Sequence, residues 1–402
     1  VPTPHLDALA QSGVRCSAGY VTAPYCSPSR AGFLTGKSQT RFGHEFNPHD
    51  GPEEILGLPL NQRTLADVLS VAGYATSLIG KWHLGGGAEY RPTRRGFDEF
   101  FGTLANTPFY HPTQFVDSRE SNDVKKIESD DFYTTDAYAD RAVEWLEQHK
   151  SKPKFLYVPF NAQHAPLQAP RKYLDRFPEI TDEKRKLFAA MMSGMDDAIG
   201  RIMGKVKELG QEESTLYFFI GDNGGPTKST TSYNGGLRGF KMTTYEGGPR
   251  VPFLVQWKGT IPGGATHDYP VLNLDVLPTA IHAAGGQTEV AWKLDGVDLL
   301  PYLTGKNKSR PHETIYWRYA PQWAVRHGDM KLVVSGDGQG SPELYDLSSD
   351  RAESTNLANS KPEKVKELQS LYDAWNSEQI ESTVPKEGNK KVVNNKKKKN
   401  KV

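Results

Sequence analysis

Apolar residues along the chain form two kinds of pattern. Continuous apolar runs predict strands buried on both faces, and they lie at 74–79, 155–160, 215–220 and 251–257. Segments with apolar residues three and four positions apart predict helices, and they lie at 3–9, 64–73, 134–149, 183–209 and 274–284. Because the two kinds alternate, the sequence predicts an α/β protein with a large, mostly parallel sheet sandwiched by helices.

The pattern changes after Gly305. Short strand-like runs follow one another at 314–318, 323–326, 330–334 and 343–346, and an amphipathic helix is expected at 363–375. Successive short strands separated by turns are typical of an antiparallel sheet. We therefore expect a main domain at 1–305, a small C-terminal antiparallel sheet with one helix at 306–385, and a tail at 386–402.

Charge is distributed unevenly over these parts. The net charge of the 402 residues is +1, but the Lys-rich tail carries +7, which leaves −6 for the rest. A mildly acidic body argues against a nucleic-acid-binding surface, and a tail of this composition is expected to be disordered and solvated. No apolar stretch reaches the roughly 20 residues of a membrane-spanning helix. We therefore expect neither a nucleic-acid partner nor a membrane span.

Polar side chains directly follow three of the predicted strands. Lys81 and His83 follow the first, His164 the second and Asp222 the third. In open α/β sheets, ligands bind beyond the carboxyl ends of the strands. We therefore expect these four residues to converge on one site.

Cys26 stands at the beginning of a further predicted helix. Ser27 followed by Pro28 is a helix-start signal, and Gly36 is a helix-stop signal. The backbone N–H groups and the dipole at a helix N-terminus favour negatively charged ligands. Cys16, the other cysteine, has no such context and is expected to be a core residue.

Six motifs resemble blocks of the formylglycine-dependent (type I) sulfatase family, in that family's order. Cys26-Ser27-Pro28-Ser29-Arg30 resembles the signature whose Cys is oxidised to formylglycine, also called 3-oxoalanine. The other blocks lie at 3–7, 80–85, 221–224, 239–248 and 294–301. Together they span about residues 1–305. The resemblance implies an arylsulfatase-like enzyme of the alkaline-phosphatase-like superfold that hydrolyses a sulfate monoester.

The resemblance also implies a role for each matching residue. Cys26 becomes an aldehyde whose hydrated form attacks sulfur, and Arg30 holds that hydrated group. His83 resembles the base that takes a proton from it. His164, with Lys241, resembles the group that protonates the leaving alcohol.

The remaining matches carry the charge of the site. Lys81 and Lys241 are expected to neutralise sulfate oxygens. Asp222 and Asn223, together with the nucleophile at position 26, form the expected metal site. Their hard oxygens favour Ca²⁺, with Mg²⁺ second. The family also carries an acidic pair on a strand upstream of the 3–7 block, so we expect the metal site and the sheet to be completed by residues before Val1.

The substrate is predicted less directly. Candidate substrate-binding residues are Asn106, His111 and Arg318, with Arg119, Trp317 and Trp323 as further polar or aromatic candidates. The family resemblance implies a sulfated carbohydrate as substrate, a formylglycine-generating enzyme as maturation partner, and a secreted or periplasmic location. Two alternatives stay open: a phosphonate or phosphate monoester hydrolase of the same superfold, and a metal-poor, inactive glycan-binding relative.

Overall fold

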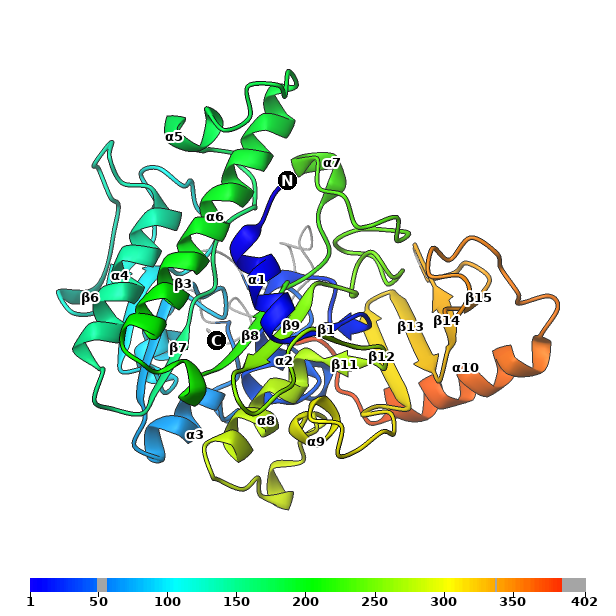
Figure 1. Cartoon of the computed structure of the whole chain (residues 1–402). Coiled ribbons are helices and arrows are strands. Elements are labelled where there is room, and N and C mark those ends of the chain that lie inside the picture. The colour runs from blue at the N-terminus through cyan, green and yellow to red at the C-terminus, as the bar shows by residue number, and fades with distance from the viewer. Residues whose placement is uncertain (49–55, 337, 385–402) are drawn as a thin grey trace, which may run out of the picture.

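The computed structural model describes residues 1–48, 56–336 and 338–384 (Figure 1). The predicted tail therefore lies outside the described residues. Helices and strands alternate through the main part of the chain, so the α/β class is confirmed. The helices are α1 (Pro4–Ser12), α2 (Cys26–Thr35), α3 (Leu65–Val71), α4 (Thr134–Gln148), α5 (Arg171–Leu174), α6 (Glu183–Glu208), α7 (Thr227–Thr230), α8 (Val276–Ala283), α9 (Leu300–Leu303) and α10 (Pro362–Ser377).

Two sheets form the centre of the main domain. The first has the strand order β6-β5-β4-β3-β7, and the second has the order β10-β1-β9-β8. Their strands are β1 (Val14–Cys16), β3 (Ala75–Lys81), β4 (Glu99–Thr103), β5 (Phe115–Asp117), β6 (Ser121–Lys125), β7 (Lys154–Tyr157), β8 (Leu216–Ile220), β9 (Phe253–Trp257) and β10 (Ala265–His267). A short pair, β2 (Gly19–Tyr20) and β11 (Val271–Leu272), lies beside them.

Strand directions are more mixed than the apolar runs predict. β3 is parallel to both β4 and β7, and β1 is parallel to β10, whereas β9 is antiparallel to β1 and β8. The chain between β8 and β9 holds only the short helix α7. β9 runs antiparallel to β8, and the apolar runs alone do not fix the direction of a strand.

The edge strands β7 and β8 are less buried than their apolar sequences predict. Every residue of β3 is buried, whereas every residue of β7 and β8 is only half-buried. Among the described residues, β7 pairs only with β3 and β8 pairs only with β9. Each strand thus has one edge without a paired strand in the described part of the chain.

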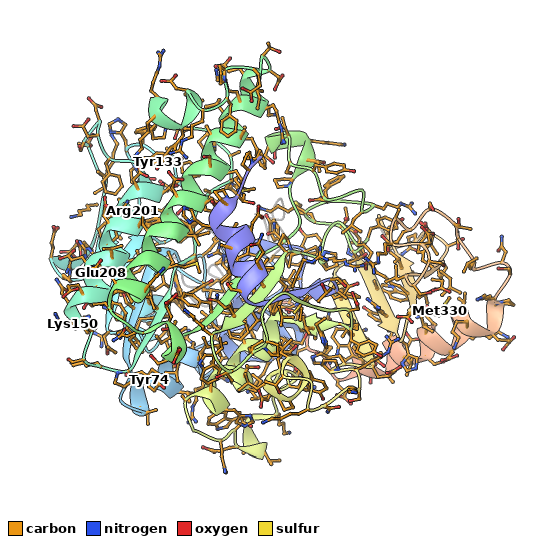
Figure 2. All side chains as sticks on the ribbon, viewed as in Figure 1. Tyr74, Tyr133, Lys150, Arg201, Glu208 and Met330 are labelled. Atoms are coloured by element: carbon orange, nitrogen blue, oxygen red, sulfur yellow. The ribbon has the colours of Figure 1, made fainter. Side chains whose placement is uncertain are left out.

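Helices α4 and α6 pack against each other and cover the five-stranded sheet (Figure 1). Their buried side chains, among them Tyr138, Trp145 and Val206, form one cluster with Ile79 of β3. On the exposed side of the same pair, Arg201 of α6 is ion-paired with Asp140 of α4 (Figure 2). The helices predicted at 134–149 and 183–209 are therefore confirmed.

The C-terminal part is an antiparallel sheet covered by α10, as predicted. Its order is β12 (Thr314–Tyr319), β13 (Gln322–His327), β14 (Met330–Val334) and β15 (Glu343–Asp346) (Figures 1 and 2). On one face, Trp323 stacks on Tyr372 of α10 with a centroid distance of 4.0 Å. On the other, Trp317 packs against Tyr20 of the main domain at 5.2 Å. The two parts of the chain therefore share an apolar core.

None of the helices in the described residues is long and apolar enough to cross a membrane.

Candidate active site

Cys26 is the first residue of α2. The helix begins one residue before the predicted Ser27-Pro28 start, because a proline is tolerated in the first turn, where its missing N–H would have no helical partner. The helix ends at Gly36, whose φ of 64° is the left-handed conformation that glycine adopts without steric cost. Cys26 is a free cysteine and only 2% exposed. Its Sγ marks the position from which a nucleophile would act.

Two buried side chains hold the first turn of α2. The Ser27 hydroxyl lies 2.6 Å from Nε2 of His44, and the Ser27 backbone N–H donates to Oδ1 of Asn47 at 3.0 Å. Burial lowers the pKa of His44 to about 4, so this imidazole is neutral near pH 7. Neither His44 nor Asn47 was predicted to take part in the site, because nothing in the local pattern around them indicates a contact with residue 27.

Lys241 and His164 face Cys26 from two different loops. Nζ of Lys241 lies 3.0 Å from Cys26 Sγ and 3.3 Å from His164 Nε2. Nδ1 of His164 lies 2.7 Å from the carbonyl oxygen of Ala165. A carbonyl can only accept and an ammonium can only donate, so Nδ1 of His164 carries the proton and Nε2 carries the lone pair. Burial and the charges of Lys81 and Lys241 lower the pKa of His164 to about 4, which agrees with a neutral ring.

Lys81 and His83 approach from the end of β3. Nζ of Lys81 donates to Oδ1 of Asn106 at 2.6 Å, and burial lowers the pKa of Lys81 to about 8. His83 is 1% exposed and has a φ of 64°. Its backbone N–H donates to the carbonyl of Leu104 at 2.9 Å, which fixes this left-handed turn. Burial and the nearby positive charges of Lys81 and Arg30 lower the pKa of His83 well below its usual value.

Arg30 connects α2 to the ends of two strands. Its Nε and Nη2 donate to Oδ2 of Asp222 at 3.2 and 2.9 Å, and its Nη1 donates to the Lys81 carbonyl at 2.7 Å. Burial would raise the pKa of Asp222, but Arg30, Lys81 and Lys241 outweigh burial and hold that pKa well below its usual range. Asp222 is therefore ionised.

Asp222 and Asn223 offer oxygens suited to a hard cation. The Asp222 side chain is 34% exposed, so its carboxylate is open to a ligand. Oδ1 of Asn223 is buried and has no hydrogen-bond partner, whereas Nδ2 donates to the Gly224 carbonyl at 3.0 Å. A buried amide oxygen without a partner is costly unless a cation or another ligand satisfies it, so the pair fits a metal. Within the described ranges, no cluster of three or more His, Cys, Asp or Glu side chains could hold a metal.

The predicted substrate residues lie at different depths. Asn106 contacts Lys81, as described above. His111 is half-exposed, and its Nε2 lies 3.1 Å from Oδ1 of Asp130. Arg318 is bound to Glu45, with Nη2 and Oε1 2.6 Å apart, and to Asn376. The further candidates are engaged in packing or ion pairs: Trp317 is fully buried, Trp323 stacks on Tyr372, and Arg119 pairs with Glu144.

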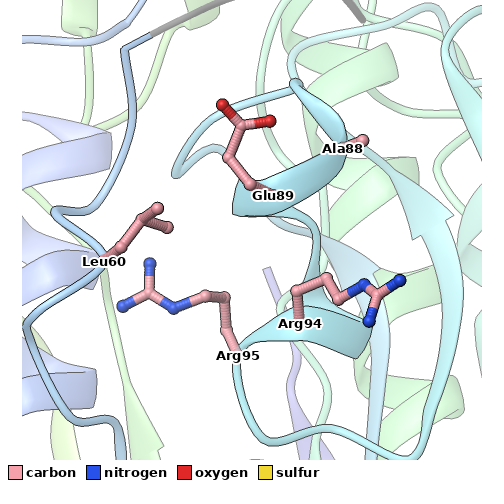
Figure 3. A pocket seen from close by; sticks show the side chains of 5 residues that line it. All are labelled: Leu60, Ala88, Glu89, Arg94 and Arg95. Carbon is pink, nitrogen blue, oxygen red and sulfur yellow. The ribbon is translucent and has the colours of Figure 1, made fainter.

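A pocket of about 510 Å³ lies elsewhere, lined by Leu60, Ala88, Glu89, Arg94 and Arg95 (Figure 3). Its most buried cation, Arg95, donates to the carbonyls of Leu58, Pro59 and Gln62 at 2.6 to 3.2 Å. None of the residues around Cys26 lines it.

The chain is similar to known families and proteins over most of its length. The sulfatase family model matches residues 1–286, and the model of the N-sulphoglucosamine sulphohydrolase C-terminal region matches residues 239–380. Arylsulfatase G of Rattus norvegicus is 32% identical over 90% of this chain and 79% of its own length. N-acetylgalactosamine-6-sulfatase of Sus scrofa is 31% identical over 82% of this chain and 66% of its own length.

Solved structures show the same relation. The crystal structure of Ps i-CgsB in complex with k-i-k-neocarrahexaose superposes with a TM-score of 0.88 at 29% identity, covering 96% of this chain and 90% of that one. The family match covers well over half of the chain and includes the residues gathered around Cys26. This chain therefore belongs to the sulfatase family, the enzymes that hydrolyse sulfuric esters.

Proposed function

We propose that this protein hydrolyses a sulfate ester of a carbohydrate with a formylglycine made from Cys26. The observation that carries the proposal is the set of charged side chains around Cys26. Lys241 lies 3.0 Å from its Sγ, and the site around it also holds Arg30, Lys81 and the ionised Asp222. A sulfate monoester carries one negative charge, so a nucleophile among fixed cations at a helix N-terminus is suited to it.

The hydrated aldehyde would supply an oxygen nucleophile and a second hydroxyl through which the sulfated enzyme can be released. Arg30 is held by Asp222 and by the Lys81 carbonyl, so its guanidinium is fixed beside residue 26. Lys81 and Lys241 neutralise the sulfate oxygens from two sides. His83 is neutral by virtue of its lowered pKa and is therefore able to accept a proton.

The hydrogen bonds favour Lys241 as the source of the proton for the leaving alcohol. His164 presents a lone pair at Nε2, and Lys241 directs a hydrogen to it. In this state His164 orients the ammonium of Lys241. The family resemblance gives the protonation to His164 with Lys241; here Lys241 would donate the proton to the leaving alcohol, and His164 would orient its ammonium.

Asp222, Asn223 and the oxygen of the modified residue 26 would hold Ca²⁺, with Mg²⁺ as second choice. The cation would polarise oxygens of the nucleophile and of the sulfate. Ca²⁺ takes six to eight oxygen ligands, so the upstream acidic pair expected from the family is part of the proposal.

Relatives support a carbohydrate substrate. N-acetylgalactosamine-6-sulfatase is named for a sugar sulfate, and Ps i-CgsB was solved with k-i-k-neocarrahexaose. Asn106, His111 and Arg318 remain proposed substrate contacts, and Asn106 is the one with a direct bond to a site lysine. We also propose maturation by a formylglycine-generating enzyme and a secreted or periplasmic location, as the family implies.

Turnover of two model esters tests the reaction class. The matured enzyme is expected to cleave nitrophenyl sulfate faster than a phenylphosphonate ester. Faster cleavage of the phosphonate would favour the rival hydrolase of the same superfold. An unmodified Cys26 with no bound Ca²⁺ in the native host would favour a glycan-binding relative without activity.

A further inference from the structure

The segment Gly239–Gly248, here called the Lys241 loop, has no helix or strand of its own. The main domain holds it at two points next to the active site. The backbone N–H of Met242 donates to the carbonyl of Pro24 at 2.8 Å, and the N–H of Gly224 donates to the carbonyl of Gly248 at 2.7 Å. These bonds join the loop to the segments of Cys26 and Asp222.

The C-terminal sheet holds the other side of the same loop. Nε2 of Gln322 donates to the Met242 carbonyl at 3.0 Å. The Tyr245 hydroxyl lies 2.7 Å from Oε1 of Glu343 and 2.9 Å from the Ser335 hydroxyl. Met242 and Tyr245, which follow Lys241 in the sequence, are thus held by β13, by β15 and by Ser335, the residue after β14.

At the centre of this contact is a buried group of charges. Nζ of Lys331, on β14, lies 2.8 Å from Oε1 of Glu246 and 3.0 Å from Oε1 of Glu353. Oε2 of Glu353 accepts the backbone N–H of Glu246 at 2.7 Å. All three side chains are 0% exposed. The C-terminal part therefore binds Glu246 of the Lys241 loop through both its side chain and its backbone.

The main domain completes the charge balance of Glu246. Its Oε2 accepts from the Tyr20 hydroxyl at 2.7 Å and from Nη1 of Arg250 at 3.0 Å. A second arginine, Arg326 of β13, donates to the Tyr20 oxygen at 2.7 Å. Such networks allow few alternative arrangements, because moving one member leaves another charge buried and unpaired.

We propose that Lys331 and Glu353 are positioning residues that hold Lys241 against the nucleophile at residue 26. They contact neither the nucleophile nor the sulfate. They act through Glu246 and fix the backbone of the loop from which Lys241 reaches Cys26. The proposal rests on the proposed function, because Lys241 is the group whose position matters for sulfate ester hydrolysis.

The test is the variant Lys331→Met, which keeps the length of the side chain and removes its charge. We expect kcat/KM to fall about 10- to 100-fold, mainly through kcat, because a misplaced charge is felt most in the transition state. Hydrogen exchange should become faster in the peptide that contains 239–248 and stay unchanged in the peptide that contains β3. Native values of both quantities would overturn the proposal.

Leu332→Ala is the matched control. Leu332 is the next residue on β14, but it packs with Leu368 and Tyr372 of α10, on the opposite face. This variant should lose stability and keep its turnover per folded molecule. An equal loss of turnover in both variants would mean that Lys331 acts only by stabilising the sheet, and would overturn the proposal.

Two further variants protect the test from a folding failure. Adding Glu353→Gln to Lys331→Met replaces the carboxyl that has lost its partner by a neutral amide and should restore part of both exchange protection and turnover. Tyr245→Phe removes only the hydroxyl that contacts Glu343 and Ser335 and should lower turnover by about threefold or more. The two proposals fail in different measurements. Absence of sulfatase activity in the native chain would refute the proposed function. Unchanged hydrogen exchange of 239–248 in the Lys331→Met protein would refute the positioning role of Lys331 and Glu353.

Discussion

The two lysines of the site reach it from two different kinds of structure. Lys81 is the last residue of β3, which is buried along its whole length and paired on both sides. Lys241 lies on a loop that is held through Glu246. The partners of Glu246 are Lys331 and Glu353, which lie 85 and 107 positions further along the sequence. Regular structure places the first charge, and a buried ion network places the second. The second charge should therefore be more sensitive to substitutions far from the site.

The largest effects are expected at the two lysines themselves. Lys81→Met and Lys241→Met each remove a positive charge that faces the sulfate, so each should lower kcat/KM by about 10²- to 10³-fold. Steady-state kinetics on nitrophenyl sulfate, with folding checked by circular dichroism, would measure this. Similar losses would show that two different scaffolds support equal roles. A nearly native rate in either variant would remove that lysine from the mechanism.

Substitutions at two glycines allow the strand that holds Lys81 and the loop that holds Lys241 to be compared directly. A Cβ on Gly224 would lie 1.8 Å from the Gly247 carbonyl oxygen, and a Cβ on Gly102 would lie 1.8 Å from the Gly80 carbonyl oxygen. Gly102→Ala pushes two paired strands apart and should cost about 1–3 kcal/mol in the free energy of unfolding. Gly224→Ala should displace the Lys241 loop and reduce turnover by about tenfold or more.

Denaturant unfolding and kinetics on both variants would separate the two effects. A larger loss of turnover per folded molecule in Gly102→Ala than in Gly224→Ala would contradict the claim that Lys241 is the more sensitive of the two lysines.

The buried ion network around Glu246 should also make the free energy of unfolding depend on pH through Glu353. Burial and the neighbouring Glu246 carboxylate raise the pKa of Glu353 from 4.5 to about 7. The folded chain then holds a proton that the unfolded chain has lost, so the contribution of Glu353 to stability is present below pH 4.5 and is lost as the pH rises through about 7. Glu353→Gln does not titrate, so its stability relative to the native chain should increase between pH 5 and pH 8.

Unfolding free energies measured across that pH range would test this. Glu208→Gln, at a side chain that is 66% exposed, serves as the control. A pH-independent difference between Glu353→Gln and the native chain would contradict the assigned direction.

The smallest effect is expected where a strand already fixes the charge. Asn106→Ala removes the oxygen that accepts from Lys81 at 2.6 Å. Because β3 continues to hold Lys81, the loss should be that of one hydrogen bond, about 0.5–1.5 kcal/mol or at most roughly tenfold in kcat/KM. A loss as large as that of Lys81→Met would contradict this expectation, because Asn106 would then matter as much as the charge that it orients.

Local patterns predicted much of the fold. The segment 183–209 was expected to be helical, and α6 spans Glu183–Glu208. At 64–73, Thr64 and Asp67 form the reciprocal bonds of a capping box, so α3 begins where the capping signal lies. Strands β4, β5 and β6 were not predicted. β4 is interrupted by Gly102 and β6 is polar and largely exposed, so neither has the apolar run of a buried strand.

Residues of the site were predictable where a strand end or a family motif marked them. Lys81, His83, His164 and Asp222 do gather around Cys26 and Arg30, as their positions after strands indicated. Lys331 could not be predicted, because a lysine between Met330 and Leu332 resembles a solvent-facing residue of an edge strand. Its burial depends on two glutamates from other segments, and neither contact leaves a signal in the local sequence.

The proposed reaction depends most on the chemical state of residue 26. Mass spectrometry of the tryptic peptide that contains this residue, from protein purified from its native host, tests it directly. Conversion of the CH₂SH side chain to CHO lowers the mass by about 18 Da. We expect that loss in most of the molecules of an active preparation. An unmodified cysteine in a preparation that turns over a sulfate ester would contradict the account.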